Sequence, residues 1–73
     1  MKVVIQDKAY QMGKTEFHKM IKEVVKPNIK RGIYAIEKGS YGELLNKTYK
    51  TQRELYAAVK VYQSIGYKVY FNK

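Results

Sequence analysis

The fold of this chain is decided by residues 51–72, TQRELYAAVKVYQSIGYKVYFN, which carry a helix with both ends marked and a strand directly behind it. Thr51 and Glu54 have the spacing of a capping box, in which the hydroxyl and the carboxylate satisfy free N–H groups at a helix start. Apolar side chains then recur at helical spacing: Leu55, Ala58, Val59 and Tyr62. Gly66 supplies the C-terminal stop, so we predict a helix between Thr51 and Gly66.

The residues after Gly66 change to a period of two, which is typical of a strand. Tyr67, Val69 and Phe71 alternate with Lys68, Tyr70 and Asn72. We expect the first three to face the core, because the other face carries a lysine and an amide that are costly to bury.

Upstream, residues 33–49 predict a hairpin. Ile33 to Ile36 are β-prone, Lys38-Gly39-Ser40 marks a turn, and residues 41–49 form the returning strand. Both faces carry apolar side chains: Ile33, Ala35 and Leu44 on one, and Tyr34, Ile36 and Leu45 on the other. The pattern therefore leaves the inner face of this hairpin open.

Residues 14–26 predict a second amphipathic helix. Its apolar stripe consists of Phe17, Met20, Ile21, Val24 and Val25. Glu16 lies three residues after Gly13, where a capping-box acid would stand, and Pro27 ends the pattern. Residues 28–32 follow as a basic connector.

The first residues predict another hairpin, with Asp7-Lys8 as a two-residue loop. In this register Ile5 faces Tyr10 and Val3 faces Met12, so that one face is apolar throughout. Since position 8 is not a glycine, a single strand followed by a loop is the alternative.

Together these elements predict one α+β domain over residues 1–73, in the order ββαββαβ. We expect a mostly antiparallel sheet with both helices on one face. A chain of this length buries roughly 60% of its unfolded surface, and without cysteine it has neither a disulfide nor a thiolate zinc site. No segment is apolar enough for a signal peptide or a bilayer span, so we expect a soluble cytoplasmic protein without membrane contact.

The charge is strongly positive: fifteen Lys and Arg against six Asp and Glu give a net charge of +9. Such a potential attracts polyanions over a Debye length of about 8 to 10 Å. It favours a nucleic acid or an acidic protein as the partner and argues against a DNA mimic. Only Arg31 and Arg53 are arginine, so the chain has few of the bidentate donors that read guanine.

No pattern indicates catalysis, a metal site or a cofactor. His18 is the only histidine, and we expect a partly exposed helix residue without the partners that a ligand or general base needs. The carboxylates include no D-x-D pair, and residues 39–42 lack the Gly-Lys-Ser/Thr ending of a phosphate-binding loop. We therefore predict that the protein is not an enzyme.

The candidate binding residues lie mainly on the helix at 14–26. Lys19, Lys22 and Lys26 share the face opposite the apolar stripe, and Lys30 and Arg31 follow just beyond the helix. They would form a phosphate-tracking surface. The alternative is a solvated helix face whose cations lie near the negative end of the helix dipole.

Some of the eight tyrosines also allow two interpretations, a binding role and a packing role. We expect Tyr10, Tyr62 and Tyr67 on core faces. If the sheet face away from the helices is open, Tyr70 with Lys68 would offer a platform on which single-stranded bases stack. The alternative is that this face is covered by a second copy in a homodimer.

Two segments, GIYAIEKG at residues 32–39 and GYKVYFN at residues 66–72, resemble small uncharacterised proteins of phages and mobile elements of low-GC Gram-positive bacteria. The resemblance covers nearly the whole chain, and its motifs are structural. It implies a small phage-type accessory protein that binds nucleic acid or a host protein in the host cytoplasm, and it assigns no residue a role.

The leading hypothesis is a small non-enzymatic protein that binds nucleic acid mainly through phosphate contacts. The alternative is an interaction module that docks on an acidic host protein and modulates or inhibits it, through the tyrosine-rich sheet face or an edge strand.

Overall fold

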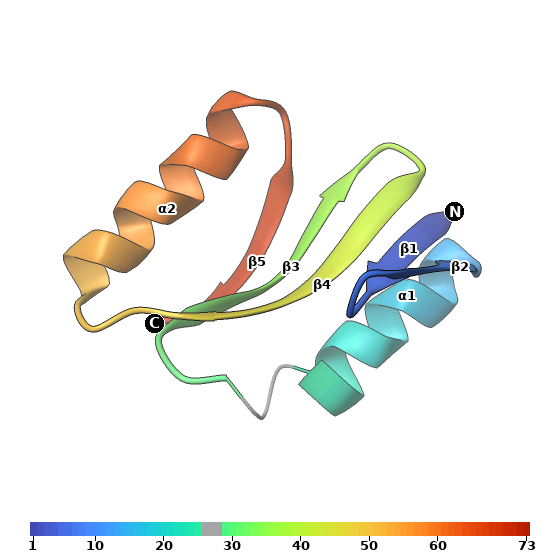
Figure 1. Ribbon diagram of the computed structural model, residues 1–73, viewed down its shortest axis with the longest axis horizontal. Helices are drawn as coiled ribbons and strands as arrows, with labels where there is room; N and C mark the ends of the chain where they lie inside the picture. Colours follow the sequence, from blue (N-terminus) through green and yellow to red (C-terminus); the bar gives the residue numbers. More distant parts are fainter. Residues whose placement is uncertain (26–28) are drawn as a thin grey trace.

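The structure is a computed structural model that describes residues 1–25 and 29–73 (Figure 1). Its elements follow the order ββαββαβ, with a π-helical turn, η1, continuing the first helix. They are β1 (Lys2–Ile5), β2 (Lys8–Gln11), α1 (Lys14–Met20), η1 (Ile21–Val25), β3 (Gly32–Lys38), β4 (Tyr41–Thr48), α2 (Gln52–Ser64) and β5 (Lys68–Asn72). The predicted α+β class and element order are confirmed.

The helix α2 has both predicted end signals. The Thr51 hydroxyl oxygen accepts a hydrogen bond from the backbone N–H of Glu54 at 3.2 Å. At the other end Gly66 has φ +93°, its N–H donates to the carbonyl of Gln63, and the Tyr67 N–H donates to that of Tyr62. These two bonds form a Schellman motif, which satisfies the last helical carbonyls and turns the chain into β5.

All the strands form one sheet of five, in the order β2-β1-β4-β3-β5. The neighbours are antiparallel except β1 and β4, which are parallel. It follows that β2 and β3 run in the same direction, as do β4 and β5, so α1 and α2 are both crossover helices between parallel strands.

The two helices pack against different apolar clusters, one on each face of the sheet. Phe17 and Ile21 of the first helical segment pack with Val3, Ala35 and partly buried Tyr70. Leu55 and Val59 of α2 pack with Ile33, Ile36 and partly buried Val69 and Phe71. Because Tyr70 and its neighbours 69 and 71 point to opposite faces of β5, α1 and α2 lie on opposite faces.

The expected placement of both helices on one face is therefore wrong, and the handedness of crossovers explains why. Both connections, β2 to β3 and β4 to β5, step the same way across the sheet, but they start from strands of opposite direction. Crossovers of the same hand must then lie on opposite faces, and such crossovers are almost always right-handed.

This arrangement also explains why the inner face of the second hairpin could not be assigned. β3 lies between β4 and β5, and residues 32–37 are all buried. The register shifts between Ile33 and Ala35, which marks a bulge. The strand has two inner faces, one under each helix, and so it needs apolar side chains on both.

The first hairpin forms, with its turn one position earlier than predicted. Gln6 and Asp7 occupy the turn with φ 49° and 68°, the positive values of a type I′ turn. Val3 consequently faces Tyr10 instead of Met12. Because the pairing shifts by two residues, each side chain keeps the face of the sheet that was predicted for it. However, β2 is an edge strand, and Tyr10, expected in the core, is 45% exposed.

The contact between α1 and the sheet depends on a glycine. An added Cβ at Gly42 in β4 would lie 2.7 Å from Cζ of the fully buried Phe17. The absence of a side chain there lets the aromatic ring lie directly on the strand. Within the described ranges, no helix is both long and apolar enough to cross a membrane.

Candidate nucleic-acid interface

Basic side chains from three separate segments meet at the end of the sheet where β3 begins. Gly32 pairs with Thr48 of β4 and with Asn72 of β5. The residues beyond these three positions therefore lie at the same end, and four of them are basic and exposed. We call this group the basic end: Lys30, Arg31, Lys50 and Lys73.

Hydrogen bonds hold the backbone of the basic end in place. Arg31, at φ 47°, donates from Nη1 to the carbonyl of Lys50 at 2.7 Å, and its own carbonyl accepts from the Tyr49 N–H at 3.0 Å. Nδ2 of Asn72 donates to the carbonyl of Ile29 at 2.7 Å. The three segments are thus tied to one another by hydrogen bonds to main-chain carbonyls, and none of these three bonds uses a lysine ammonium group.

The predicted stripe on the first helix is present in part. Lys19 in α1 and Lys22 in η1 are exposed and line one shallow hollow together with His18. Lys26 lies outside the described residues. Because Lys14 and His18 contact Glu37 at the far end of β3 while the chain enters β3 at Gly32, the helix runs toward the basic end, and Lys22 is nearer to it than Lys19.

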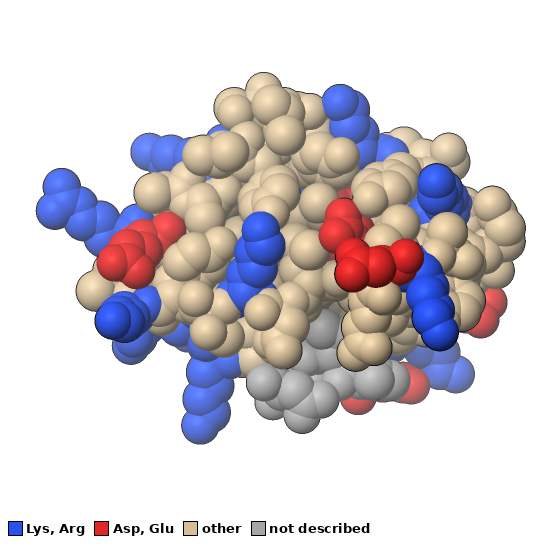
Figure 2. All heavy atoms as spheres, in the orientation of Figure 1, with Lys and Arg blue, Asp and Glu red and all other residues tan. Residues whose placement is uncertain are grey.

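Few of these cations are neutralised by carboxylates. Within residues 1–25 and 29–73, Lys14 is the only Lys or Arg with a carboxylate oxygen within 4.0 Å. Figure 2 shows Lys and Arg side chains around much of the visible face, several of them near the C-terminus and the start of α2. The positive potential is therefore available to a ligand outside the protein.

Tyr70 and Lys68 occupy a different setting from the one expected. The ammonium of Lys68 lies 5.3 Å from the centroid of the Tyr70 ring, so the pair exists. Tyr70, however, faces α1 instead of an open face, is partly buried, and donates a hydrogen bond from its hydroxyl to Oε1 of Glu37 at 2.7 Å. The open stacking platform that we expected at Tyr70 is absent, because the two helices cover opposite faces.

Glu37 is the centre of a polar cluster that the sequence patterns did not reveal. It is buried, with 7% of its surface exposed, between α1 and β5. Oε1 lies 2.9 Å from Nε2 of His18, and Oε2 lies 3.6 Å from Nζ of Lys14. His18 is partly exposed, as expected, but it has a carboxylate partner nineteen positions away in the sequence.

The ionisation of this cluster follows from its contacts. Burial opposes the charged form of Glu37, but hydrogen bonds from His18 and Tyr70 and the positive charges of His18 and Lys14 outweigh it, so its pKa is lowered. Burial, and then the hydrogen bond to the Glu37 carboxylate, raise the pKa of Tyr70. The cluster thus links α1 to β3 and β5 through an ionised carboxylate.

A carboxyl whose pKa is lowered by folding makes stability depend on pH. Below about pH 4.5 the unfolded chain binds the proton more readily than the folded one, so acid favours unfolding. We expect Glu37→Gln to lower the unfolding free energy at pH 7 by about 1 to 3 kcal/mol. The difference from the wild type should shrink as the pH falls below 4.5, in urea titrations followed by circular dichroism at pH 7, 5, 4 and 3.

The matched control for that experiment is Glu23→Gln in η1, an exposed carboxylate with no ion pair among the described residues. Its unfolding free energy should change by less than about 0.5 kcal/mol at pH 7. A wild-type advantage over Glu37→Gln that stays constant down to pH 3 would contradict the role of the ionised carboxylate.

Lys50 and Lys73 are the binding candidates that the sequence analysis missed. Neither belongs to a periodic pattern, and both lie far along the chain from Lys30 and Arg31. Only the pairing of Gly32 with both Thr48 and Asn72 brings them together. Across the described part of the chain, no three His, Cys, Asp or Glu side chains are grouped to hold a metal ion.

Comparison with protein-family models, with curated proteins and with solved structures gives no match to this chain. The resemblance to small phage proteins therefore stays a prediction.

Proposed function

We propose that this protein binds nucleic acid through phosphate contacts made by the basic end together with Lys19, Lys22 and Lys26. The observation that carries the proposal is the convergence of four basic side chains from three segments, none of them with a carboxylate neighbour among the described residues. Neutralising phosphates releases condensed counterions, which drives binding of this kind without any base contact.

The chemistry of these residues indicates little sequence preference. Most of them are lysines, which act as point charges, and Arg31 already donates from Nη1 to the carbonyl of Lys50. Because Tyr70 faces α1 and its hydroxyl is held by Glu37, base stacking on its ring contributes less than the charge. Binding to the phosphate backbone is the mode that the surface supports best.

Salt dependence tests this function directly. We expect the affinity for a fluorescein-labelled duplex of 20 base pairs to fall with a log–log slope of about −3 to −6, since each neutralised phosphate contributes about −0.9. Duplexes of scrambled sequence should bind within about twofold of one another. A dissociation constant that does not change with salt, or no binding even at 20 mM salt, would exclude the proposal.

A second candidate function is docking on an acidic protein of the host, for which the C-terminal end of α2 provides a specific observation. Val61 in the last turn of α2 and Ile65, the residue that caps it, are 62% and 55% exposed. A pull-down with and without nuclease treatment separates the two functions: a partner retained after nuclease supports protein docking, and one lost after nuclease supports nucleic acid. The same surface would serve a homodimer, which sedimentation detects.

The setting that we propose is that of a small accessory protein without enzymatic activity, acting in the cytoplasm of a bacterial host. It rests on the resemblance of residues 32–39 and 66–72 to small phage proteins and on the charge.

A further inference from the structure

The sheet has a notch beside β4. β1 has four residues and β4 has eight, and the two strands pair only from Lys2 with Tyr41 to Val4 with Glu43. After Ile5 the chain turns away into β2. On the side of β4 that faces β1, no described strand pairs with residues 45–48. In any strand, some of the backbone N–H and C=O groups point to each of its two edges, so residues 45–48 offer such groups on this side.

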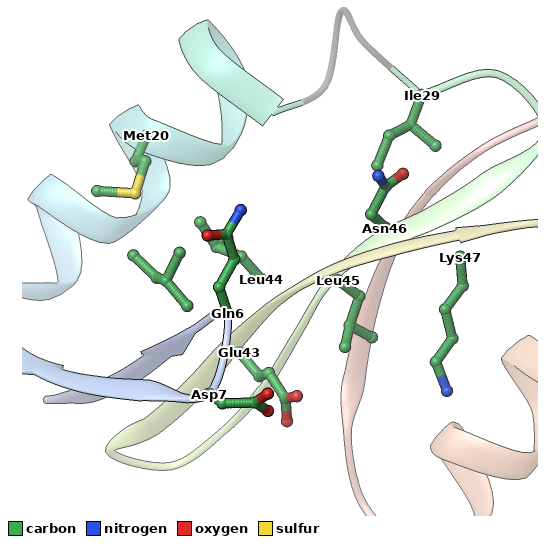
Figure 3. Close-up of a pocket in the computed structure, with 10 residues that line it drawn as sticks. Gln6, Asp7, Met20, Ile29, Glu43, Leu44, Leu45, Asn46 and Lys47 are labelled. Carbon is green, nitrogen blue, oxygen red and sulfur yellow. The ribbon is translucent and has the colours of Figure 1, made fainter.

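A pocket of about 640 Å³ lies at this notch (Figure 3). Met20, Ile29 and Leu44 line it on the side of α1 and give it an apolar wall. Asp7 and Glu43 line it on the opposite side, where Figure 3 shows both carboxylates pointing the same way.

The described lining of the pocket carries two carboxylates and one basic side chain. That side chain, Lys47, donates from Nζ to the Tyr62 hydroxyl at 3.0 Å and so extends toward α2, while it stays within electrostatic range of Glu43. Glu43 keeps its carboxylate on this side through a hydrogen bond from the Tyr41 hydroxyl at 2.9 Å. Although the chain has a net charge of +9, two carboxylates in this pocket favour a ligand with a basic side chain and disfavour one with an acidic side chain.

We propose that the notch binds an extended peptide segment of a partner protein, which adds to the sheet as a strand beside β4, in line with β1. Side chains of a strand point alternately to the two faces. The segment would place apolar side chains against Met20, Ile29 and Leu44, and a Lys or Arg, one position away, toward Asp7 and Glu43. Main-chain hydrogen bonds to residues 45–48 supply affinity, and the two walls supply specificity.

The notch adjoins the basic end, but this proposal is independent of nucleic-acid binding, because it uses main-chain groups of β4 and two carboxylates instead of the basic side chains. The test uses the full chain as the target for a displayed library of random twelve-residue peptides, and a selected peptide, made synthetically, as the probe. We expect the selected peptides to alternate apolar residues with Lys or Arg. In ¹⁵N-labelled protein they should shift the amide signals of residues 45–48.

Two further measurements separate strand addition from simple charge attraction. Two probes are made, each N-methylated on alternate amides, so that the methyl groups lie on one edge of the peptide strand or on the other. The probe methylated on the edge that faces β4 should bind about tenfold more weakly, and the other probe should keep its affinity, since only one edge forms hydrogen bonds with β4. Asp7→Asn and Glu43→Gln should each weaken binding about two- to fivefold, whereas Glu54→Gln in α2, the matched control, should not.

Three results would overturn the proposal. They are a library that yields no binder at 100 μM protein, a probe whose amide shifts map to β2 or β5 instead of residues 45–48, and equal affinity for both N-methylated forms. If one of these variants lost duplex binding, that result would bear on the proposed function and not on the peptide site, because the peptide assay contains no nucleic acid.

Discussion

Replacing Lys30 and Lys50 together with glutamate is expected to lower the affinity for duplex at 0.1 M salt by at least about 50-fold. At this salt concentration, counterion release contributes about 0.9 to log K for each phosphate contact. Losing two contacts therefore lowers the affinity by nearly a factor of 100, before repulsion between the new glutamates and the phosphates is counted. Both side chains are exposed, and the hydrogen bond from Arg31 to position 50 uses the main chain, so the fold should persist. Fluorescence anisotropy measures the affinity, and circular dichroism checks the fold.

In the matched control, Lys2 and Lys60 are replaced with glutamate, which changes the net charge by the same amount. Lys2 pairs with Tyr41 at the other end of the sheet, and Lys60 lies on the exposed side of α2. We expect a loss of less than about fivefold, because exposed charges more than a Debye length from the ligand are screened. If both double variants lose affinity equally, the protein acts as a diffuse positive charge and the basic end has no special role.

The largest expected loss of stability is that of Phe17→Ala, at about 3 to 5 kcal/mol. The Phe17 ring is fully buried, lies against the bare backbone of Gly42, and connects α1 to the cluster that contains Val3 and Ala35. A domain of 73 residues has a total unfolding free energy of about 4 to 11 kcal/mol, so this one change would consume much of it. Urea unfolding followed by circular dichroism measures the loss.

Tyr10→Ala is the control for Phe17→Ala. Both changes truncate an aromatic side chain, but Tyr10 is 45% exposed on the edge strand β2, and we expect a loss below about 1 kcal/mol. Equal losses would show that α1 does not depend on the Phe17 contact. Since α1 carries Lys19 and η1 carries Lys22, Phe17→Ala should also weaken duplex binding at temperatures where the domain is still folded.

Elements whose ends are marked by neighbouring residues were predictable from the sequence. The hydroxyl of Thr51 caps α2, and Gly66 ends it, through contacts between residues three to five positions apart. The alternation of Tyr67, Val69 and Phe71 likewise identified both β5 and the face that packs on α2. The turn at Gln6 and Asp7 was misplaced, because neither residue is the glycine that usually marks positive φ values.

The candidate site was predictable only where it follows one helix. Lys19 and Lys22 share a face through helical periodicity alone, and the structure keeps them together. The polar cluster has no such local signal, because Glu37 meets His18 and Tyr70 across nineteen and thirty-three positions of the chain. The interpretation of Tyr70 as an open platform depended on which faces the helices cover.

The sequence by itself determined the order ββαββαβ, the net charge of +9 and the apolar face of each helix, because capping, periodicity and charge act between near neighbours or over the whole chain. Only the tertiary structure decided that the helices lie on opposite faces, that Lys50 and Lys73 join Lys30 and Arg31, and that no described strand pairs with residues 45–48 on the side of β1. These features depend on strand direction, crossover hand and pairing register, which join residues distant in the chain and leave no local pattern.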